Sequence, residues 1–575
     1  MKSLVVTLLL SVWLYALPYT ISNEIRKSGI PKKEISIYIK EAGKQGKVIA
    51  SLNADKSRTP ASLIKVLTTY AAALKLGFDY RWPTQFYKAG HLTNGVLHGD
   101  LVIKGFGDPT LNDEDLETIV RIIRAKGIRQ IRGDIIIDRS YFEVGDKDSS
   151  GFDENLYSAY NAMPDAMMFN ERVVTVCVHP QEKRAHKENA DESYRVVNQL
   201  EHVNKPCRGR YSWPGVSIDK SEVVPTVLLK GKISKRCGKR KICKVVTKPY
   251  KSFYYAIKEQ LNEKGITVRG TLKLRKVPRN ATMLFTHYSE PLEEIISETA
   301  KESNNLYARH LLLLLGAQVY GAPATLEKGR DAIVSILKTK GALGRGTLKI
   351  DNGSGLSRIS RINARQLAQL YDDAYDHYGD KWMESLSIAG IDGTIKRRFR
   401  HTAAKKRAWM KTGTLKRVKN IGGYVKNRAG KLYTVVILIN STKAKYRGAK
   451  LQNEIIKWLA KSKAKPTVKY RSKTVQQKKR IPQKLFSNVK TSAPVHSKKM
   501  NQTFGPKYYI QTGAFSNMPN RDYLGKIETL GFRYKVHHTD SYKVLIGAYA
   551  DEKGARAALQ KVRAKINEGA FIVKL

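Results

Sequence analysis

Three short motifs carry residues that could together perform nucleophilic catalysis. Ser62 and Lys65 stand three residues apart, and Ser303-Asn304-Asn305 and Lys411-Thr412-Gly413 follow further along the chain. A serine hydroxyl is a weak nucleophile until a base takes its proton. The twelve histidines form no recognisable catalytic motif, so a lysine is the candidate base, and burial or a nearby cation must lower its pKa. These residue types predict acyl transfer through Ser62.

The order and the surroundings of the three motifs distinguish them from chance matches. Lys-Thr-Gly occurs once, whereas Ser-x-Asn recurs at Ser51. Ser-x-x-Lys also recurs, as expected by chance in a chain rich in lysine. The further matches are Ser217/Lys220, Ser335/Lys338, Ser462/Lys465 and Ser487/Lys490.

Ser62 is expected to open a helix. It follows Thr59-Pro60-Ala61 and starts an apolar-periodic run that reaches Leu74, and proline before a small hydroxyl residue is a good helix start. Residues three apart lie on one helix face, so the Lys65 amine can reach the Ser62 hydroxyl. The alternative is a serine that only caps the helix, beside a solvated lysine.

The other two motifs are predicted on a strand and in a loop. Residues 408–415 form a strand-like run, which residues 422–439 continue as a hairpin with a turn at 427–430. Residues 303–305 fall between the helical patterns 292–301 and 306–315 and could aim a hydroxyl and an amide into a cleft. An ordinary turn for Lys-Thr-Gly and an asparagine-rich helix cap for residues 303–305 are the alternatives.

In this order the motifs resemble those of the low-molecular-mass penicillin-binding proteins, in the D-alanyl-D-alanine carboxypeptidase/endopeptidase class with a large insertion between the first two motifs. Residues 105–111, 351–358 and 389–399 extend the resemblance, which covers about residues 30–460. Asn304 stands where this class commonly has aspartate.

The resemblance implies a role for each motif residue. Ser62 would be the nucleophile, Lys65 the general base, and Ser303 a proton relay to the leaving amine. Asn305 would hold Lys65 and the substrate amide. Lys411, Thr412 and Thr414 would bind the terminal carboxylate beside Gly413, the backbone N–H groups of Ser62 and Thr414 would form the oxyanion hole, and β-lactams would acylate Ser62. No metal-binding motif, phosphate-binding loop or dinucleotide fingerprint appears in the sequence, so we expect no cofactor.

The last residues resemble a SPOR domain, a module whose family binds peptidoglycan glycan strands stripped of their stem peptides. Strand and helix patterns follow in the order βαββαβ, and the stretches 511–515 and 543–549 carry the resemblance. Gln511 and Tyr542 are the expected glycan contacts. The alternative is a small α/β domain whose aromatic residues are core.

The predicted fold class is multidomain α/β (α+β). It consists of an antiparallel sheet flanked by helices, as in serine β-lactamases and D,D-peptidases, with a β-rich insertion and a C-terminal βαββαβ domain. The predicted division is an export signal at 1–22, a split catalytic domain at 23–84 and 286–460, an insertion at 85–285, a disordered basic linker at 461–504 and the SPOR-like domain at 505–575.

The chain ends and the cysteines point to an exported protein. Leu4 to Tyr15 form a short apolar core after Lys2, with cleavage expected near Ser22 and an uncleaved anchor as the alternative. Four cysteines lie in the insertion, which suggests one or two disulfides with three possible connectivities; free buried thiols are the alternative. They are Cys177, Cys207, Cys237 and Cys243.

A net charge of +54 suggests an anionic partner. No nucleic-acid-binding motif accompanies it, so wall peptides, lipid headgroups or lipopolysaccharide are the expected partners. The expected location is periplasmic, with the division site as a candidate within it. A non-catalytic wall-binding scaffold and a β-lactamase remain alternative functions. The sequence sets neither the oligomeric state nor the preference between carboxypeptidase and endopeptidase activity.

Overall fold

The computed structural model describes residues 17–464 and, with gaps at 516–518, 520, 531, 533, 539–541 and 550–551, residues 508–574. The chain separates into two compact units, Met1–Lys478 and Lys479–Leu575, which are treated one at a time below. The predicted linker therefore lies almost entirely outside the described residues, as does most of the predicted export signal.

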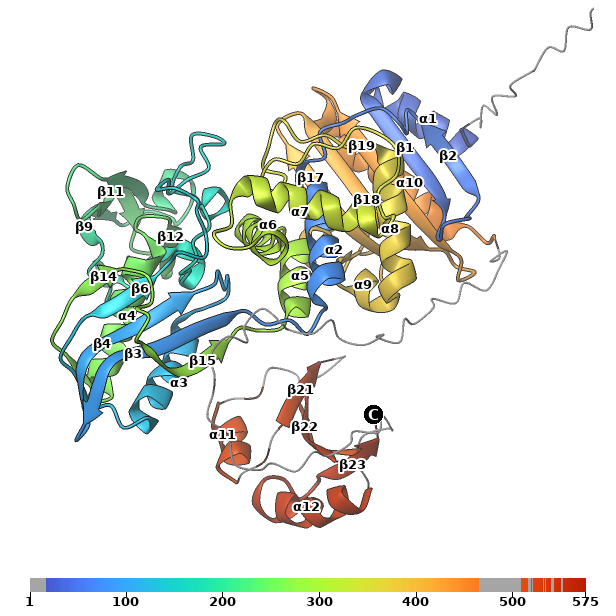
Figure 1. Ribbon diagram of the computed structural model, residues 1–575. Coiled ribbons are helices and arrows are strands. Elements are labelled where there is room, and N and C mark those ends of the chain that lie inside the picture. Colours follow the sequence, from blue (N-terminus) through green and yellow to red (C-terminus); the bar gives the residue numbers. More distant parts are fainter. Residues whose placement is uncertain are drawn as a thin grey trace, which may run out of the picture. The chain divides into compact units, whose positions relative to one another are not determined.

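A six-stranded antiparallel sheet lies between two sets of helices at one end of the first unit (Figure 1). Its β1 strand is buried along nearly its whole length because helices cover both faces of the sheet. The hairpin predicted at residues 408–439 is confirmed as β17, β18 and β19. In spatial order the strands are β16 (Ser387–Ile388), β17 (Ala408–Leu415), β18 (Val418–Lys426), β19 (Leu432–Asn440), β1 (Ile35–Glu41) and β2 (Val48–Leu52).

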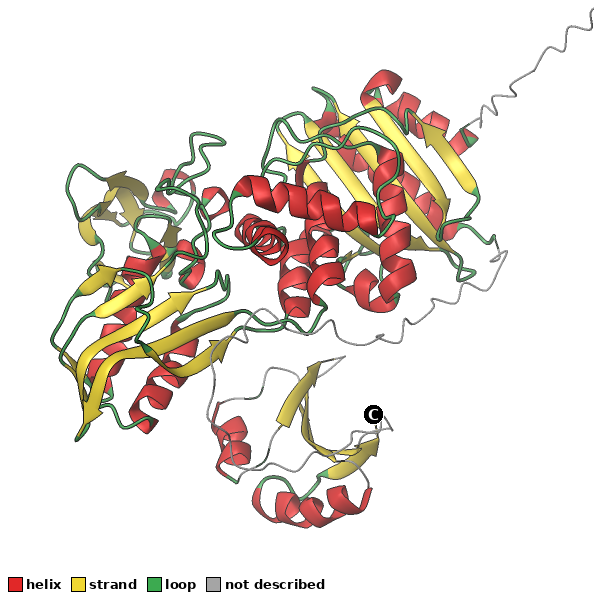
Figure 2. Ribbon diagram, viewed as in Figure 1, coloured by secondary structure: helices red, strands yellow, loops and turns green. Residues whose placement is uncertain are grey.

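Two helices, α1 (Tyr19–Ser28) and α10 (Ala449–Lys461), cover one face of the sheet and share one apolar core with it. The other face packs on a helical layer with its own core (Figure 2). The helices of this layer are α2 (Ile64–Leu76), α5 (Leu292–Lys301), α6 (Asn305–Tyr320), α7 (Leu326–Thr339), α8 (Ala364–Tyr378) and α9 (Asp380–Glu384). The predicted antiparallel sheet flanked by helices is thus confirmed.

The insertion is β-rich, as expected, and runs from β3 to β15, which pair with each other. One seven-stranded sheet packs on α3 (Asp113–Ala125) and α4 (Pro249–Glu263). Its strands are β3 (Pro83–Thr93), β4 (Val96–Gly105), β5 (Gln130–Ile131), β6 (Ile135–Asp138), β13 (Thr267–Val268), β14 (Leu272–Leu274) and β15 (Thr282–Tyr288). Two three-stranded sheets share a further core. One contains β7 (Val174–His179), β8 (Arg184–Lys187) and β12 (Arg240–Lys244). The other contains β9 (Arg195–Val203), β10 (Gly215–Asp219) and β11 (Thr226–Ser234).

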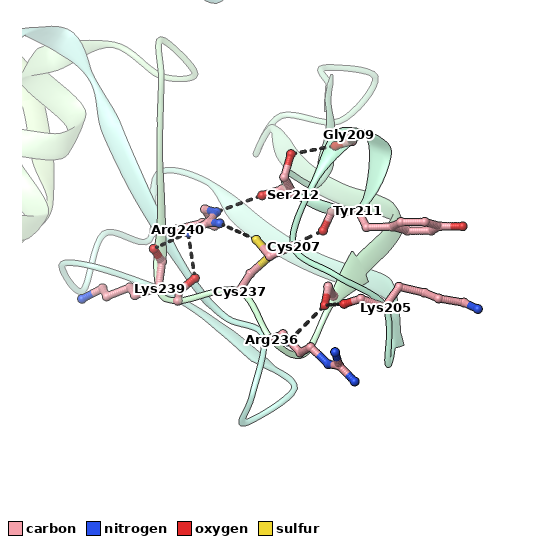
Figure 3. The surroundings of a disulfide bond; sticks show 11 residues. Lys205, Cys207, Gly209, Tyr211, Ser212, Arg236, Cys237, Lys239 and Arg240 are labelled. Carbon is pink, nitrogen blue, oxygen red and sulfur yellow. Dashed lines mark hydrogen bonds between the residues drawn. A yellow bond between two sulfur atoms is a disulfide. The ribbon is translucent and has the colours of Figure 1, made fainter.

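One disulfide, Cys207–Cys237, joins two loops of the insertion (Figure 3). Among the cysteine pairings that the sequence allowed, this disulfide is the only one that the structure contains. Cys177 is a buried free thiol, and Cys243 on the neighbouring strand is an exposed one.

The second unit has the predicted βαββαβ order. Its four strands form one antiparallel sheet in the order β21-β22-β20-β23. The elements are β20 (Tyr508–Phe515), α11 (Arg521–Thr529), β21 (Tyr534–His538), β22 (Tyr542–Tyr549), α12 (Glu552–Lys565) and β23 (Phe571–Lys574). Across both units, no helix among the described residues has the length and apolarity needed to cross a membrane.

Candidate active site

Ser62 lies in a single 3-10 turn, Ala61–Leu63, immediately before α2. Its side chain caps neither this turn nor α2, which removes the alternative of a simple helix cap. Ala61 has a left-handed backbone with φ of 50°, a conformation that costs a non-glycine residue energy and needs support from its surroundings. Gly355 packs directly against this turn, so closely that a Cβ at position 355 would lie 2.0 Å from the Ala61 carbonyl oxygen. This contact supports the left-handed conformation of Ala61.

Lys65 is fully buried one helical turn from Ser62. Its Nζ lies 3.3 Å from Ser62 Oγ, 2.6 Å from Asn305 Oδ1 and 2.5 Å from the Ser354 carbonyl oxygen. A neutral amine has two protons and one lone pair. If Asn305 and Ser354 accept the two protons, the lone pair is left for the Ser62 hydroxyl, which is the geometry of a general base.

The electrostatic surroundings favour this neutral amine. Burial lowers the pKa of Lys65 well below its ordinary value, and the nearby cations of Lys411 and Arg309 lower it further. Arg309 is almost completely buried on α6, four residues after Asn305. The sequence reasoning missed Arg309, although the helical spacing from Asn305 could have identified it.

Ser303 and Lys411 form the second half of the site. Lys411, fully buried on β17, donates from Nζ to Ser303 Oγ at 2.9 Å and to the Thr412 carbonyl at 3.1 Å. Burial lowers the pKa of Lys411 to about 7, an effect that Glu302 partly offsets. The structure thus brings all five predicted catalytic side chains together through two lysines, and both of these amines have depressed pKa values.

The Ser303-Asn304-Asn305 turn joins α5 to α6 as predicted. Asn304 caps α6 by accepting from the backbone of Leu306 and Tyr307, so the cap interpretation holds for Asn304 but leaves Ser303 and Asn305 available to the site. Ser303 has a left-handed backbone with φ of 63°.

The insertion also contacts this turn. Glu171 accepts from Asn304 Nδ2 at 3.3 Å and from the Tyr307 hydroxyl at 2.8 Å. Asn305 Nδ2 donates to the Tyr160 carbonyl at 3.0 Å. No local sequence signal could have found these partners, which lie more than a hundred positions away from the turn.

The remaining predicted substrate-binding residues line β17. Gly413 packs against residue 60, and a Cβ on it would lie 2.6 Å from the Pro60 carbonyl oxygen. The Thr412 hydroxyl donates to Thr394 at 2.9 Å, and Thr414 Oγ1 accepts from Lys419 at 3.2 Å. Neither threonine hydroxyl bonds to any of the five predicted catalytic side chains, and Thr414 is exposed.

In the second unit, Gln511 is half-buried on β20, where its backbone pairs with Leu545 and Phe571. Tyr542 begins β22 opposite Phe515, and its side chain lies outside the described residues. The structure therefore places both predicted glycan contacts on the sheet without testing their role.

A serine held against a buried lysine, with a second lysine and serine opposite, defines an active-serine acyl-transfer enzyme that uses a lysine base. The D-Ala-D-Ala carboxypeptidase 3 (S13) family matches residues 17–462, and the chain belongs to this family of serine peptidases. A SPOR domain matches residues 505–574.

Known proteins resemble the chain over most of its length. A D-alanyl-D-alanine carboxypeptidase DacB from Haemophilus influenzae is 28% identical over 414 residues, 69% of this chain and 83% of that protein. A D-alanyl-D-alanine carboxypeptidase from Actinomadura sp. (strain R39) is 29% identical over 404 residues, 67% of this chain and 74% of that protein. The crystal structure of penicillin binding protein 4 from Haemophilus influenzae has the same fold, with a TM-score of 0.66 at 24% identity over 77% of this chain and 99% of that one.

Proposed function

We propose that this D-Ala-D-Ala carboxypeptidase cuts the D-Ala-D-Ala end of peptidoglycan stem peptides, or a D,D-cross-link between them, through an acyl-enzyme on Ser62. The observation that carries the proposal is the position of the Lys65 amine, 3.3 Å from Ser62 Oγ and held by two acceptors. The same site would make β-lactams covalent inhibitors.

The residues suggest the following sequence of steps. Lys65 takes the proton of Ser62, whose Oγ attacks the carbonyl carbon of the penultimate D-alanine. The backbone N–H groups of Ser62 and Thr414 would stabilise the oxyanion. As the C–N bond breaks, the proton that Lys65 took from Ser62 passes through the Ser303 hydroxyl to the leaving amine, which leaves Lys65 neutral again and Lys411 charged. Water then hydrolyses the ester and regenerates Ser62.

Substrate binding would depend on β17 and on Asn305. Lys411 supplies positive charge for the terminal carboxylate, and the hydroxyls of Thr412 and Thr414 supply donors along the strand beside Gly413. Asn305 would hold the substrate amide as well as Lys65. The second unit would tether the enzyme to glycan strands through Gln511 and Tyr542.

Peptidoglycan lies outside the cytoplasmic membrane, so the enzyme acts at an extracellular or periplasmic location. We infer a periplasmic enzyme with the domain division predicted above. The first boundary is the exception. Ile21 is fully buried in the core that α1 and α10 share with the sheet, which favours a signal boundary before Tyr19 over one after Ser22.

Labelling with a fluorescent penicillin, beside Ser62→Ala, tests the proposal. A stable adduct on the wild type that is absent from the variant is the expected result. A folded wild type that forms no adduct would contradict an acylating serine and favour a wall-binding scaffold, and an adduct that turns over rapidly would indicate a β-lactamase.

A further inference from the structure

We propose that the face of the first unit formed by α1 and the π-helical turn Ala444–Gly448, just before α10, docks on an anionic lipid bilayer. Two surface hollows meet on this face and share Gly29. We call their aromatic and cationic lining the tyrosine–basic face. It comprises Tyr19, Arg26, Lys27, Lys32, Lys443, Tyr446 and Arg447.

The two tyrosines distinguish this face from the rest of a basic surface. Tyr19 is 80% exposed and Tyr446 is 77% exposed, which makes them, with Val223, the most exposed large apolar residues in the described part of the chain. Amphipathic rings of this kind are enriched where membranes meet water, because one end is apolar and the other is wet.

The charge of the face fits the same partner. No aspartate or glutamate lines either hollow. Lys27 pairs with Glu24 at 2.9 Å in an exposed contact, and Lys443 donates to the Gly29 carbonyl at 2.8 Å. Clustered lysine and arginine near a surface attract anionic headgroups within a Debye length, and their side chains can extend to the headgroup level.

Before the export signal is cleaved, the chain itself brings this face to a membrane. The apolar run Leu4 to Tyr15 ends four residues before Tyr19, and four residues span at most about 14 Å. While that run occupies a bilayer, Tyr19 must therefore lie close to the headgroups. A free anionic wall polymer would satisfy the charges but would give the two exposed tyrosine rings no apolar phase.

The test uses residues 17–575, which keep every described residue, and vesicles that contain brominated phosphatidylglycerol, whose acyl chains quench nearby tryptophan. Tyr446→Trp should add fluorescence quenching above that of the wild type. Val223→Trp is the control, because Val223 is 91% exposed on the insertion, and it should add none. Two results would overturn the proposal: equal quenching of the two introduced tryptophans, or no added quenching at position 446 while the protein is bound to vesicles. Either result would assign the binding to the linker or to another surface.

A charge-reversal pair gives a second readout. Lys443→Glu with Arg447→Glu should weaken binding to phosphatidylglycerol vesicles at least tenfold. Lys340→Glu with Arg345→Glu changes the same charge at exposed positions beyond the end of α7 and should weaken binding less than threefold. An equal loss in both pairs would show that net charge alone drives the association. Penicillin labelling of each variant confirms that the catalytic unit is folded.

Discussion

At the residue scale, the proposed mechanism requires two buried lysines in different protonation states. Lys65 must be neutral to accept the Ser62 proton, whereas Lys411 must be charged to attract a carboxylate. The cation of Lys411 helps to keep Lys65 neutral, so the charge on one lysine supports the function of the other. Because the pKa of Lys411 is itself about 7, this arrangement is sensitive to pH.

We therefore expect the rate of penicillin acylation to fall as the pH rises above about 7, because Lys411 loses its charge there. This decrease is the falling limb of the pH profile. Lys411→Arg keeps the charge, because arginine does not deprotonate in this range, and should remove the falling limb even if the maximum rate is lower. An unchanged falling limb in that variant would show that another group controls it.

At the element scale, the turn before α2 depends on close packing from a distant loop. Gly355→Ala would place a methyl group 2.0 Å from the Ala61 carbonyl oxygen, so residues 61 and 62 must move. We expect penicillin labelling to fall by about 100-fold or more, since catalytic geometry tolerates little displacement. Gly430→Ala is the control: its φ is also positive, at 84°, but nothing lies within 4 Å of the added carbon. That variant should lose about 1 kcal/mol of stability and keep its labelling rate.

The insertion should also influence catalysis, through the 3-10 turn at Asn170–Arg172. Three consecutive residues there have left-handed backbones, and Glu171 at their centre reaches Asn304 and Tyr307. Hydrogen bonds to a charged group contribute about 1.5–3 kcal/mol each. We expect Glu171→Ala to lower kcat about tenfold while KM changes little, because Ser303 loses its position and the carboxylate-binding groups do not.

Tyr307→Phe supplies the comparison for Glu171, since it removes one of the two hydrogen bonds and leaves the carboxylate in place. Its effect on kcat should be smaller, and Glu171→Gln should restore part of the activity. A Glu171→Ala variant with normal kcat and a lower melting temperature would reduce Glu171 to a structural role.

The elements around the three motifs could be predicted from the sequence because their signals are local. The Pro60–Ser62 helix start, the hairpin after Lys411 and the loop at Ser303 depend on periodicity and turn chemistry. The left-handed conformations of Ala61 and Ser303 could not be predicted, since distant contacts stabilise them. Likewise, four cysteines gave no pairing, because pairing depends on which loops of the insertion meet.

At the scale of the whole molecule, the insertion meets the catalytic helices at a joint that carries two buried titratable groups. His310 on α6 shares a hydrogen bond of 2.8 Å with the Gly107 carbonyl, and Asp108 is the next residue. Burial lowers the pKa of His310 to about 4 and raises the pKa of Asp108 to about 6. The two groups have opposite effects on stability. Burial favours the neutral form of each group. The stability that neutral His310 contributes is lost as the pH falls from about 6.5 towards 4. The stability that protonated Asp108 contributes is lost as the pH rises through about 6.

Asp108→Asn should separate these two effects. The Asp108 Oδ1 atom accepts from the backbone and the hydroxyl of Thr110, at 2.8 and 2.6 Å, and an asparagine oxygen can accept both bonds. The Asp108 Oδ2 atom is buried without a partner, so its ionised form is costly. At about 1.4 kcal/mol for each pKa unit, the shift from 3.8 to about 6 corresponds to about 3 kcal/mol. The variant should therefore gain stability relative to the wild type as the pH rises from about 4 to about 7. It should also be the more acid-sensitive protein, because His310 then acts without an opposing group. Urea unfolding at several pH values measures both effects, and a stability difference that does not change with pH would show that folding does not raise the pKa of Asp108.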